Sequence, residues 1–384
     1  MNTRRYFLRH CMLNSSTLAM GGLLAGCGGG AEARSIAPLP PINSGADVQQ
    51  ADGWRMPDES ERHAATWMAF GANDEVWGKR LKAGAQADLA RIARAIASVE
   101  PVHMLVNEED YDVAARLCDN KVKLLVQPID DLWMRDTGPV FVKHAGGALA
   151  GVNFNFNGWG GKQDHGDDAL VAPFVAGRAG AAVLESSLVL EGGGIEVDGQ
   201  GTAIITESCV LNANRNPGVG KARCELELRR LLGIEKVIWL PGIAGQDITD
   251  GHTDFYARFC APGVVAAGFE NDPTSPERAV TQRHLDILRK ATDARGRPLQ
   301  VVVLPGPAYV RPRYENQDFA AGYINFYVCN GAVLCPEFGD AAADRNTKAI
   351  LREQFPGRDI VQLNIDAIAA GGGGIHCTTQ QQQA

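Results

Sequence analysis

Cys377 follows a run of glycines and is the first candidate for chemistry in this chain. The stretch reads Gly371-Gly372-Gly373-Gly374-Ile375-His376-Cys377. Glycine runs occur where the backbone takes a positive φ or passes close to a ligand. A thiol held there suggests a nucleophile at the floor of a pocket, although a lone cysteine is more often a small buried hydrophobe. The remaining polar segments must decide between these two interpretations.

Three further segments place a carboxylate or an imidazole beside a glycine or a turn. They are Trp133-Met134-Arg135-Asp136-Thr137-Gly138-Pro139, Leu190-Glu191-Gly192-Gly193-Gly194 and Asp250-Gly251-His252-Thr253-Asp254. In an extended segment His252 and Asp254 would point to the same face. Alone, each segment also fits a surface ion pair, a solvated turn or a core histidine. Together they supply the imidazole of His252 and the carboxylates of Asp136, Glu191 and Asp254 to accompany the thiol.

Carboxylates around a thiol favour a substrate that is itself a cation. They raise the pKa of a thiol above its usual value of about 8.5, which is a poor arrangement for cleaving a neutral amide. A guanidinium binds carboxylates in a planar fork and would favour a nearby thiolate. The G-x-S-x-G elbow of serine hydrolases and the papain-type signature are both absent from the sequence. The predicted reaction is therefore attack on a guanidinium carbon with loss of ammonia.

The elements that must position these residues alternate between short apolar runs and amphipathic helices. The periodicity predicts helices at 81–96, 109–117, 166–178, 221–232, 276–292 and 344–355, strands at 102–106, 122–127, 237–240 and 301–304, strand pairs around 322–338, and a hairpin turning at 198–201. The segment 153–161 also alternates like a strand, with aromatic residues that wall a pocket or pack. A hairpin, a helix and a single strand recur four or five times without a clean period. We expect one α/β domain over residues 52–384, without a nucleotide-binding glycine loop.

These segments resemble the agmatine deiminases and the Porphyromonas-type peptidylarginine deiminases of the guanidine-modifying pentein superfamily. The resemblance covers about residues 53–382. Further blocks that carry it are Gly53-Trp54-Arg55-Met56-Pro57, Asn212-Ala213-Asn214-Arg215-Asn216-Pro217 and Ile375-His376-Cys377-Thr378-Thr379-Gln380-Gln381. It implies an α/β propeller of five ββαβ units with pseudo-fivefold symmetry and the active site on its axis.

The resemblance also implies a role for each candidate residue. Cys377 is the expected nucleophile, and His252 is the acid that protonates departing ammonia and then the base that activates water. Asp136 and Asp254 are expected to hold the guanidinium, while Glu191 orients His252. The expected substrate-binding set adds Trp133, Arg135, Trp159 and Gly374. The intermediate would be a covalent thiouronium, with neither a metal nor an organic cofactor.

Three positions depart from the pattern of the agmatine deiminases. Gly374 and Phe255 stand where asparagine is usual, and Ile248 stands where glutamate is usual. The first departure affects the nucleophile loop, and the other two affect what the non-guanidine end of the substrate meets. Hydrolysis of agmatine to N-carbamoylputrescine is the leading prediction. Citrullination of peptides, amidino transfer to an amine and binding of a guanidine or polyamine without turnover are the alternatives.

The first residues predict export and a lipid anchor. Thr3-Arg4-Arg5-Tyr6-Phe7-Leu8-Arg9 is close to the twin-arginine pattern, and Leu24-Ala25-Gly26-Cys27 resembles a lipobox that would be acylated at Cys27. We expect residues 1–26 to be a signal peptide and residues 27–51 to be a tether. The protein is then expected in the cell envelope or periplasm, attached to the membrane only by the lipid on Cys27.

Composition and charge narrow the classes of partner. The net charge is −8 and no basic patch appears, so nucleic acid is not an expected partner. The cysteines beyond Cys27 form no C-x-x-C pair, which disfavours a zinc cluster or a disulfide framework. The sequence leaves a homodimer open.

Overall fold

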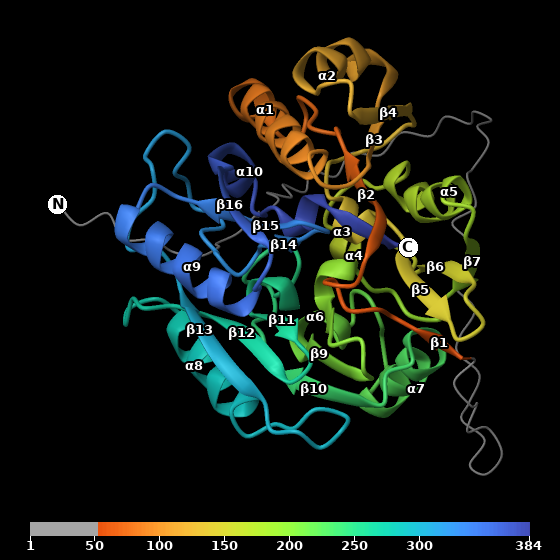
Figure 1. Ribbon diagram of the computed structural model, residues 1–384, viewed down its shortest axis with the longest axis vertical. Coiled ribbons are helices and arrows are strands. Elements are labelled where there is room, and N and C mark those ends of the chain that lie inside the picture. Colours follow the sequence, from red (N-terminus) through yellow and green to blue (C-terminus); the bar gives the residue numbers. More distant parts are fainter. Residues whose placement is uncertain (1–52) are drawn as a thin grey trace, which may run out of the picture.

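Five small sheets surround a common centre in the computed structural model, which describes residues 53–384 (Figure 1). Each sheet contains an antiparallel pair of strands and a further strand that runs parallel to the second member of the pair. A helix connects the pair to that parallel strand. The predicted α/β propeller of five ββαβ units is therefore confirmed.

Four of the units follow one another along the chain. They comprise β5 (Val140–His144), β6 (Leu149–Asn153), α5 (Val171–Arg178) and β7 (Ala182–Glu185); β8 (Ile195–Val197), β9 (Thr202–Thr206), α7 (Lys221–Leu232) and β10 (Lys236–Leu240); β11 (Ala257–Ala261), β12 (Val264–Phe269), α8 (Glu277–Leu288) and β13 (Gln300–Pro305); and β14 (Tyr327–Val328), β15 (Ala332–Glu337), α9 (Ala341–Gln354) and β16 (Asp359–Asn364).

The fifth unit joins the two ends of the described chain. Its first strand is β17 (Gln380–Gln383), which pairs antiparallel with β2 (His63–Ala69). Helix α1 (Gly78–Ile96) then leads to β3 (Val102–Val106), and α2 (Tyr111–Leu117) leads to the extra strand β4 (Val122–Val126). The two-residue strand β1 (Trp54–Arg55) pairs with β5. The ring of units is thus closed by pairing across the whole length of the domain.

Helix α1 shows why these helices pack where they do. Its Leu89, Ile92 and Ile96 lie on one face at helical spacing and are fully buried. Burying an aliphatic side chain of this size contributes about 1.5–3 kcal/mol, so the apolar stripe fixes the helix against its sheet. Helix α7 ends at Leu232, and the next residue, Gly233, has a left-handed φ of 67° that a β-branched residue would not tolerate well.

Two local predictions were wrong. The strand expected to continue through 153–161 ends at Asn153, because Asn155 and Trp159 take positive φ values of 56° and 55°. The segment with His252 and Asp254 is not extended, since Thr253–Phe255 forms the single 3-10 turn η4. Both segments therefore form turns in place of the extended strands that the sequence pattern suggested.

The remaining short elements lie mostly beside first strands or in connections. They are α3 (Met134–Thr137), α4 (Gly158–Gly161), α6 (Glu207–Val210), α10 (Asp366–Ala370), η1 (Glu108–Asp110), η2 (Asp168–Leu170), η3 (Gly192–Gly194) and η5 (His376–Thr378).

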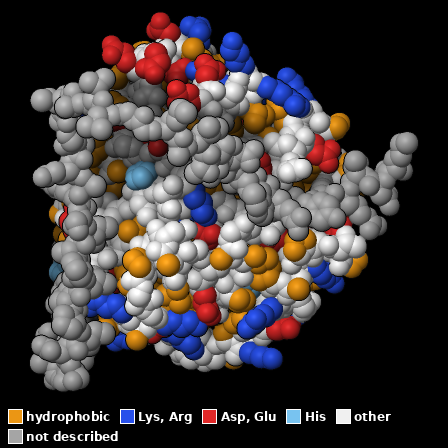
Figure 2. All heavy atoms as spheres, turned by 180° about the vertical axis from the view of Figure 1, so that it is seen from behind, with side chains coloured by type: hydrophobic (Ala, Val, Ile, Leu, Met, Phe, Trp, Pro, Cys, Tyr) orange, Lys and Arg blue, Asp and Glu red, His pale blue; other side chains and the backbone are white. Residues whose placement is uncertain are grey.

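The surface charges and the helices bear on whether nucleic acid or a membrane could be a partner. On the face shown in Figure 2, side chains of Lys and Arg are interspersed with those of Asp and Glu. Within residues 53–384, no helix combines the length and the apolar character needed to cross a bilayer. The predicted signal peptide, the tether and Cys27 lie outside the described residues.

Candidate active site

Each of the five units contributes one side chain to the site from the turn just before its first strand. Asp136 precedes β5, Glu191 precedes β8, Asp254 precedes β11, Asn325 precedes β14 and Cys377 precedes β17. First strands of neighbouring units contact one another, as β17 does with β5 and β11 with β8. Because equivalent positions of a propeller face its centre, these five side chains converge although they come from distant parts of the chain.

The glycine runs allow close approach around this centre. A Cβ atom at Gly193 would lie 2.6 Å from Nδ1 of His252, and one at Gly192 would lie 2.3 Å from the Arg135 carbonyl oxygen. In the nucleophile loop, a Cβ at Gly373 would lie 2.2 Å from the Trp133 ring. Any larger residue would push these groups apart.

Cys377 carries a buried thiol in contact with both a carboxylate and an amide. Its Sγ lies 3.5 Å from Oδ2 of Asp254 and 3.3 Å from Nδ2 of Asn325. Burial, and then the charges of Asp254 and Asp136, raise the pKa of the Cys377 thiol well above its usual range. The thiol is therefore protonated at neutral pH until a positive charge arrives.

Asp254 has one oxygen committed to the protein and one that is not. Its Oδ2 lies 2.7 Å from Nδ1 of His376. Its Oδ1 is buried and has no hydrogen-bond partner among residues 53–384. Burial opposes ionisation, but the hydrogen bond and charge of His376 outweigh it and lower the pKa of Asp254. An ionised, buried oxygen without a partner is costly unless a ligand supplies the donor.

Asp136 is the second carboxylate near the thiol. Its Oδ1 accepts a hydrogen bond from the Gly193 amide at 3.0 Å, and its Oδ2 accepts one from Nε1 of Trp159 at 3.0 Å. Burial raises the pKa of Asp136 to about 6, with His252 opposing that rise. Trp159, predicted to bind substrate, thus reaches the site by orienting this carboxylate.

His252 lies between two carboxylates, which favours its charged form. Nε2 is 3.3 Å from Oε2 of Glu191, and Nδ1 is 3.7 Å from Oδ1 of Asp136. Burial works against a charged ring, but Asp136, then Cys209 and Glu191 outweigh it and raise the pKa of His252 well above its usual range. The ring can therefore donate a proton at neutral pH.

Arg215 was not among the predicted site residues, although it lies in the block 212–217 that carries the family resemblance. Its Nε is 2.8 and 3.0 Å from the two oxygens of Glu191, and its Nη1 is 2.8 Å from Asp250. Burial alone would raise the pKa of Glu191, but Arg215 outweighs that effect and lowers it. Arg215 therefore keeps Glu191 ionised against His252.

Glu191, Cys209 and His252 also satisfy the spacing of a metal site. Their ligand atoms lie within 4.8 Å of one another, and all three residues are buried. However, the Nε of Arg215 already donates to both oxygens of Glu191. The arrangement is therefore better suited to charging His252 than to holding a cation, and a reaction without metal stays our prediction.

Arg135 supports the nucleophile loop, and within residues 53–384 it forms no hydrogen bond or ion pair with Asp136 or Asp254. Its guanidinium donates to the His376 carbonyl oxygen at 3.3 Å, to Gln381 at 2.8 Å and to Glu59 at 3.1 Å. Glu59, another residue that we missed, also accepts from Nη2 of Arg258 at 2.7 Å and contacts Nε2 of His376 at 2.9 Å. These contacts give Arg135 a supporting role behind the nucleophile loop, and its binding to substrate stays a prediction.

Trp133 and Gly374 form the walls of the nucleophile loop. The indole of Trp133 donates to Oδ2 of Asp131 at 3.1 Å, and its ring packs 5.7 Å from that of Trp77. A Cβ on Gly374 would lie 2.4 Å from Oδ1 of Asn325, so this position has no room for a side chain.

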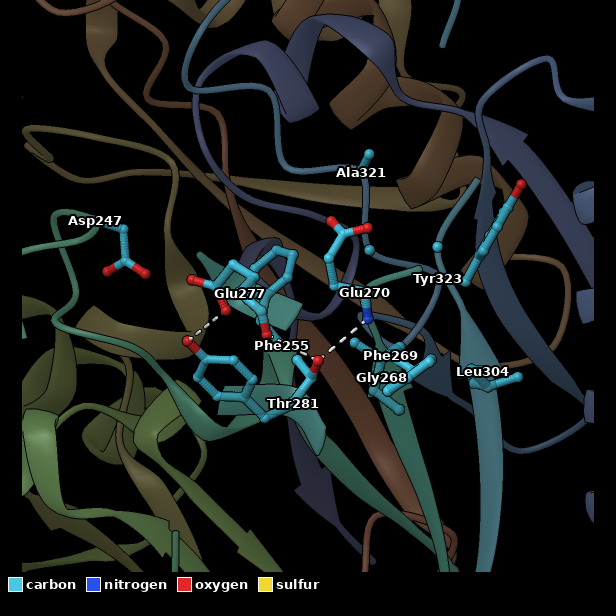
Figure 3. A pocket seen from close by; sticks show the side chains of 14 residues that line it. Asp247, Phe255, Gly268, Phe269, Glu270, Glu277, Thr281, Leu304, Ala321 and Tyr323 are labelled. Atoms are coloured by element: carbon cyan, nitrogen blue, oxygen red, sulfur yellow. Dashed lines mark hydrogen bonds between the residues drawn. The ribbon is translucent and has the colours of Figure 1, made fainter. Parts of the chain in front are cut away.

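A cavity with an acidic wall is lined by chain neighbours of two site residues, and Figure 3 shows the side chains that line it. Its empty volume is about 560 Å³, part of which is open to solvent, and its wall includes Phe255 and Ile324, the chain neighbours of Asp254 and Asn325. The charged residues that line it are Asp247, Glu270 and Glu277, and none of its lining residues is basic. Burial raises the pKa of Glu277 to about 7. Two of the three positions that depart from the agmatine deiminase pattern lie near this cavity. Phe255 lines it, and Ile248 is exposed and follows the lining residue Asp247 in the sequence.

Comparison with known proteins agrees with this geometry. The family described as Porphyromonas-type peptidyl-arginine deiminase matches residues 55–383. The agmatine deiminase of Pseudomonas aeruginosa is 38% identical over 366 residues, covering 89% of this chain and 99% of the relative. That of Stutzerimonas stutzeri is 39% identical over 357 residues, covering 87% and 96%. The solved agmatine deiminase of Enterococcus faecalis superimposes with a TM-score of 0.81 at 34% identity, covering 86% of this chain and 96% of that one.

Proposed function

Because the chain belongs to the Porphyromonas-type peptidyl-arginine deiminase family, we propose that it hydrolyses agmatine to N-carbamoylputrescine and ammonia. It is a hydrolase that acts on the C–N bonds of linear amidines, as its agmatine deiminase relatives are. One observation carries the proposal furthest. A buried thiol lies with two buried carboxylates, and Oδ1 of Asp254 has no partner among the described residues. Such a site needs a planar cation with several N–H donors, and a guanidinium is one.

Binding of the guanidinium prepares the nucleophile. Its positive charge offsets Asp254 and Asp136, the two carboxylates that raise the pKa of the Cys377 thiol. The thiol then loses its proton to solvent more readily, and the thiolate lies against the bound carbon. Two carboxylates fix the orientation of the planar group, and such positioning can supply several kcal/mol.

The first half of the reaction forms the covalent intermediate. The Cys377 thiolate attacks the guanidinium carbon and forms a C–S bond. The imidazolium of His252 gives its proton to the departing nitrogen, and the C–N bond breaks to release ammonia. A cationic thiouronium on Cys377 remains. General acid catalysis of this kind contributes about 10²- to 10⁴-fold.

The second half uses the neutral imidazole that the first half leaves. His252 takes a proton from water, whose oxygen adds to the thiouronium carbon. When the adduct collapses, the C–S bond breaks and its electron pair returns to Cys377. The hydroxyl proton of the adduct leaves to solvent, and the neutral ureido product is released. Glu191, held ionised by Arg215, stabilises the imidazolium that forms again.

The acidic cavity favours a substrate whose second charge is positive. A bound guanidine must extend its other end away from Asp254, and Phe255 connects that carboxylate to the cavity. Asp247, Glu270 and Glu277 attract an ammonium and repel a carboxylate (Figure 3). This supports agmatine over free arginine.

A product assay tests the proposal. The purified protein is incubated with agmatine, free arginine and an arginine-containing peptide, and ureido product and ammonia are measured. We expect turnover of agmatine and its loss in Cys377→Ala. Turnover that survives Cys377→Ala would refute the mechanism, and turnover of the peptide alone would refute the substrate.

We also propose that the protein is exported through the twin-arginine route and anchored by a lipid on Cys27. The support is the order and spacing of the two motifs in residues 1–27. Changing Arg4 and Arg5 to Lys should leave the protein in the cytoplasm, and Cys27→Ala should release exported protein from membranes. Unchanged fractionation of both variants would contradict the proposal.

A further inference from the structure

Asn325 holds the place in its unit that the four other site residues hold in theirs. It lies two residues before β14, and it is fully buried. Four equivalent positions carry Asp136, Glu191, Asp254 and the nucleophile, and the mechanism above uses all of them. The fifth position, at Asn325, has no role in that mechanism.

The backbone fixes which end of the Asn325 amide faces the sulfur. Oδ1 accepts hydrogen bonds from the amides of His376 at 3.0 Å and Cys377 at 3.4 Å. An oxygen that accepts from two N–H groups cannot be the amide nitrogen, so the orientation of the group is set. Nδ2 consequently lies 3.3 Å from Sγ of Cys377 and 3.5 Å from the Asp254 carbonyl oxygen, whereas Oδ1 is farther from Sγ, at 3.6 Å.

Gly374 is what lets this amide reach the nucleophile. A Cβ there would overlap Oδ1, Cγ and Cβ of Asn325, at 2.4, 2.8 and 3.0 Å. The Asn325 amide therefore fills the space that a side chain at position 374 would need. The nucleophile loop is held by a side chain from the neighbouring unit.

We propose that Asn325 is a catalytic residue whose Nδ2–H group donates a hydrogen bond to the Cys377 thiolate. The thiolate forms twice in the cycle, before attack and when the C–S bond breaks. Both times the amide offers it a neutral donor in a site where the nearest charged groups are carboxylates. Hydrogen bonds to charged groups are the stronger ones, and loss of one costs about 10- to 100-fold in the population of the charged form. The proposal rests on the proposed role of Cys377 as nucleophile.

Asn325→Asp separates this role from mere support of the loop. The aspartate keeps the size of the side chain and an oxygen for the two backbone amides. It removes the N–H donor and, when ionised, adds a negative charge beside the sulfur, and both changes disfavour the thiolate. Asn325→Ala removes the donor and the acceptor without adding a charge, so it shows the loss of the donor without the effect of charge. Asn120→Asp makes the same chemical change at an exposed position far from the nucleophile loop in sequence, and it serves as the control.

The assay is alkylation of Cys377 by iodoacetamide across pH, followed by peptide mass spectrometry, with unfolding temperature measured alongside. We expect Asn325→Asp to move the midpoint of alkylation to higher pH and to slow alkylation at pH 8 about 10- to 100-fold. The control should match the unmodified protein. Asn325→Ala should also slow alkylation and, in addition, lower the unfolding temperature.

Two outcomes would overturn the proposal. One is an Asn325→Asp protein that is folded and alkylates with the unmodified pH profile. The other is slowed alkylation in Asn325→Ala alone, which would make Asn325 a support for the loop. Because alkylation needs no turnover of agmatine, failure here is distinct from failure of the proposed substrate.

Discussion

Replacing Asp136 by asparagine should stabilise the fold while it removes activity. The carboxylate is almost fully buried, and burial raises its pKa to about 6 from an ordinary value of 3.8. A raised pKa means that the folded protein favours the neutral acid over the anion. The protein therefore loses stability as the pH rises from about 4 to about 6, and above that range the loss is complete.

The size of the effect follows from that pKa. Each pKa unit corresponds to about 1.4 kcal/mol, so ionised Asp136 destabilises the fold by roughly 3 kcal/mol at neutral pH. Asparagine has one acceptor for the two donors, the Gly193 amide and Nε1 of Trp159, and the lost hydrogen bond costs about 1 kcal/mol. A net gain of roughly 2 kcal/mol remains, or about 3 °C in unfolding temperature for a domain of this size.

The assay combines unfolding and turnover. Unfolding temperatures of the unmodified protein and Asp136→Asn are compared at pH 7.5 and pH 5, and kcat/KM for agmatine is measured at pH 7.5. We expect the variant to be more stable at pH 7.5, with a smaller gap at pH 5, and to lose about 100- to 1,000-fold in kcat/KM through the missing charged hydrogen bonds.

Glu191→Gln is the matched control with the opposite sign. Arg215 lowers the pKa of Glu191, so this anion stabilises the folded protein at neutral pH, and its removal leaves a buried guanidinium poorly paired. Both variants should be inactive, but Glu191→Gln should unfold at a lower temperature. A lower unfolding temperature for Asp136→Asn at pH 7.5 would refute the reasoning.

Three further predictions concern the loop, the cavity and pH. Gly374→Ala should lower kcat about 10-fold or more and lower the free energy of unfolding by about 1–3 kcal/mol, because its Cβ would overlap Asn325. A variant with the kcat and unfolding temperature of the unmodified protein would contradict this overlap. Glu277→Gln should raise the KM for agmatine about 3- to 10-fold with little change in kcat, and an unchanged KM would remove the cavity from substrate binding. The kcat/KM for agmatine should rise as the pH passes about 6, where Asp136 ionises. A flat profile between pH 5 and 7 would show that ionised Asp136 does not hold the guanidinium.

Periodicity was sufficient for the outer layer of the molecule. The helix predicted at 221–232 has those bounds in α7, and the hairpin predicted to turn at 198–201 connects β8 to β9. These elements are amphipathic or alternate regularly, so local pattern and tertiary burial agree. Strand β17, which consists of glutamines, carries no apolar signal and was missed.

The centre of the site was harder to predict in detail. Residues such as Cys377 and His252 have unusual chemistry next to glycine, and this made them visible in the sequence. Glu59 and Asn325 have no such signal, because their roles depend on partners more than fifty residues away. Arg135 was visible for the same reason as Cys377, but its direction is decided by which side of a one-turn helix it occupies. Sequence spacing cannot specify that direction.

Strand β17 also determines when the protein can first act. Nε1 of Trp67 donates to Gln382 across 315 residues, and the nucleophile lies in the turn that leads into this strand. During translation, β2 leaves the ribosome long before its partner β17 exists. The emerging chain can build four units, yet it has no nucleophile and no closed ring. Catalysis must therefore wait until synthesis has passed residue 383, when β17 can pair with β2 and close the ring.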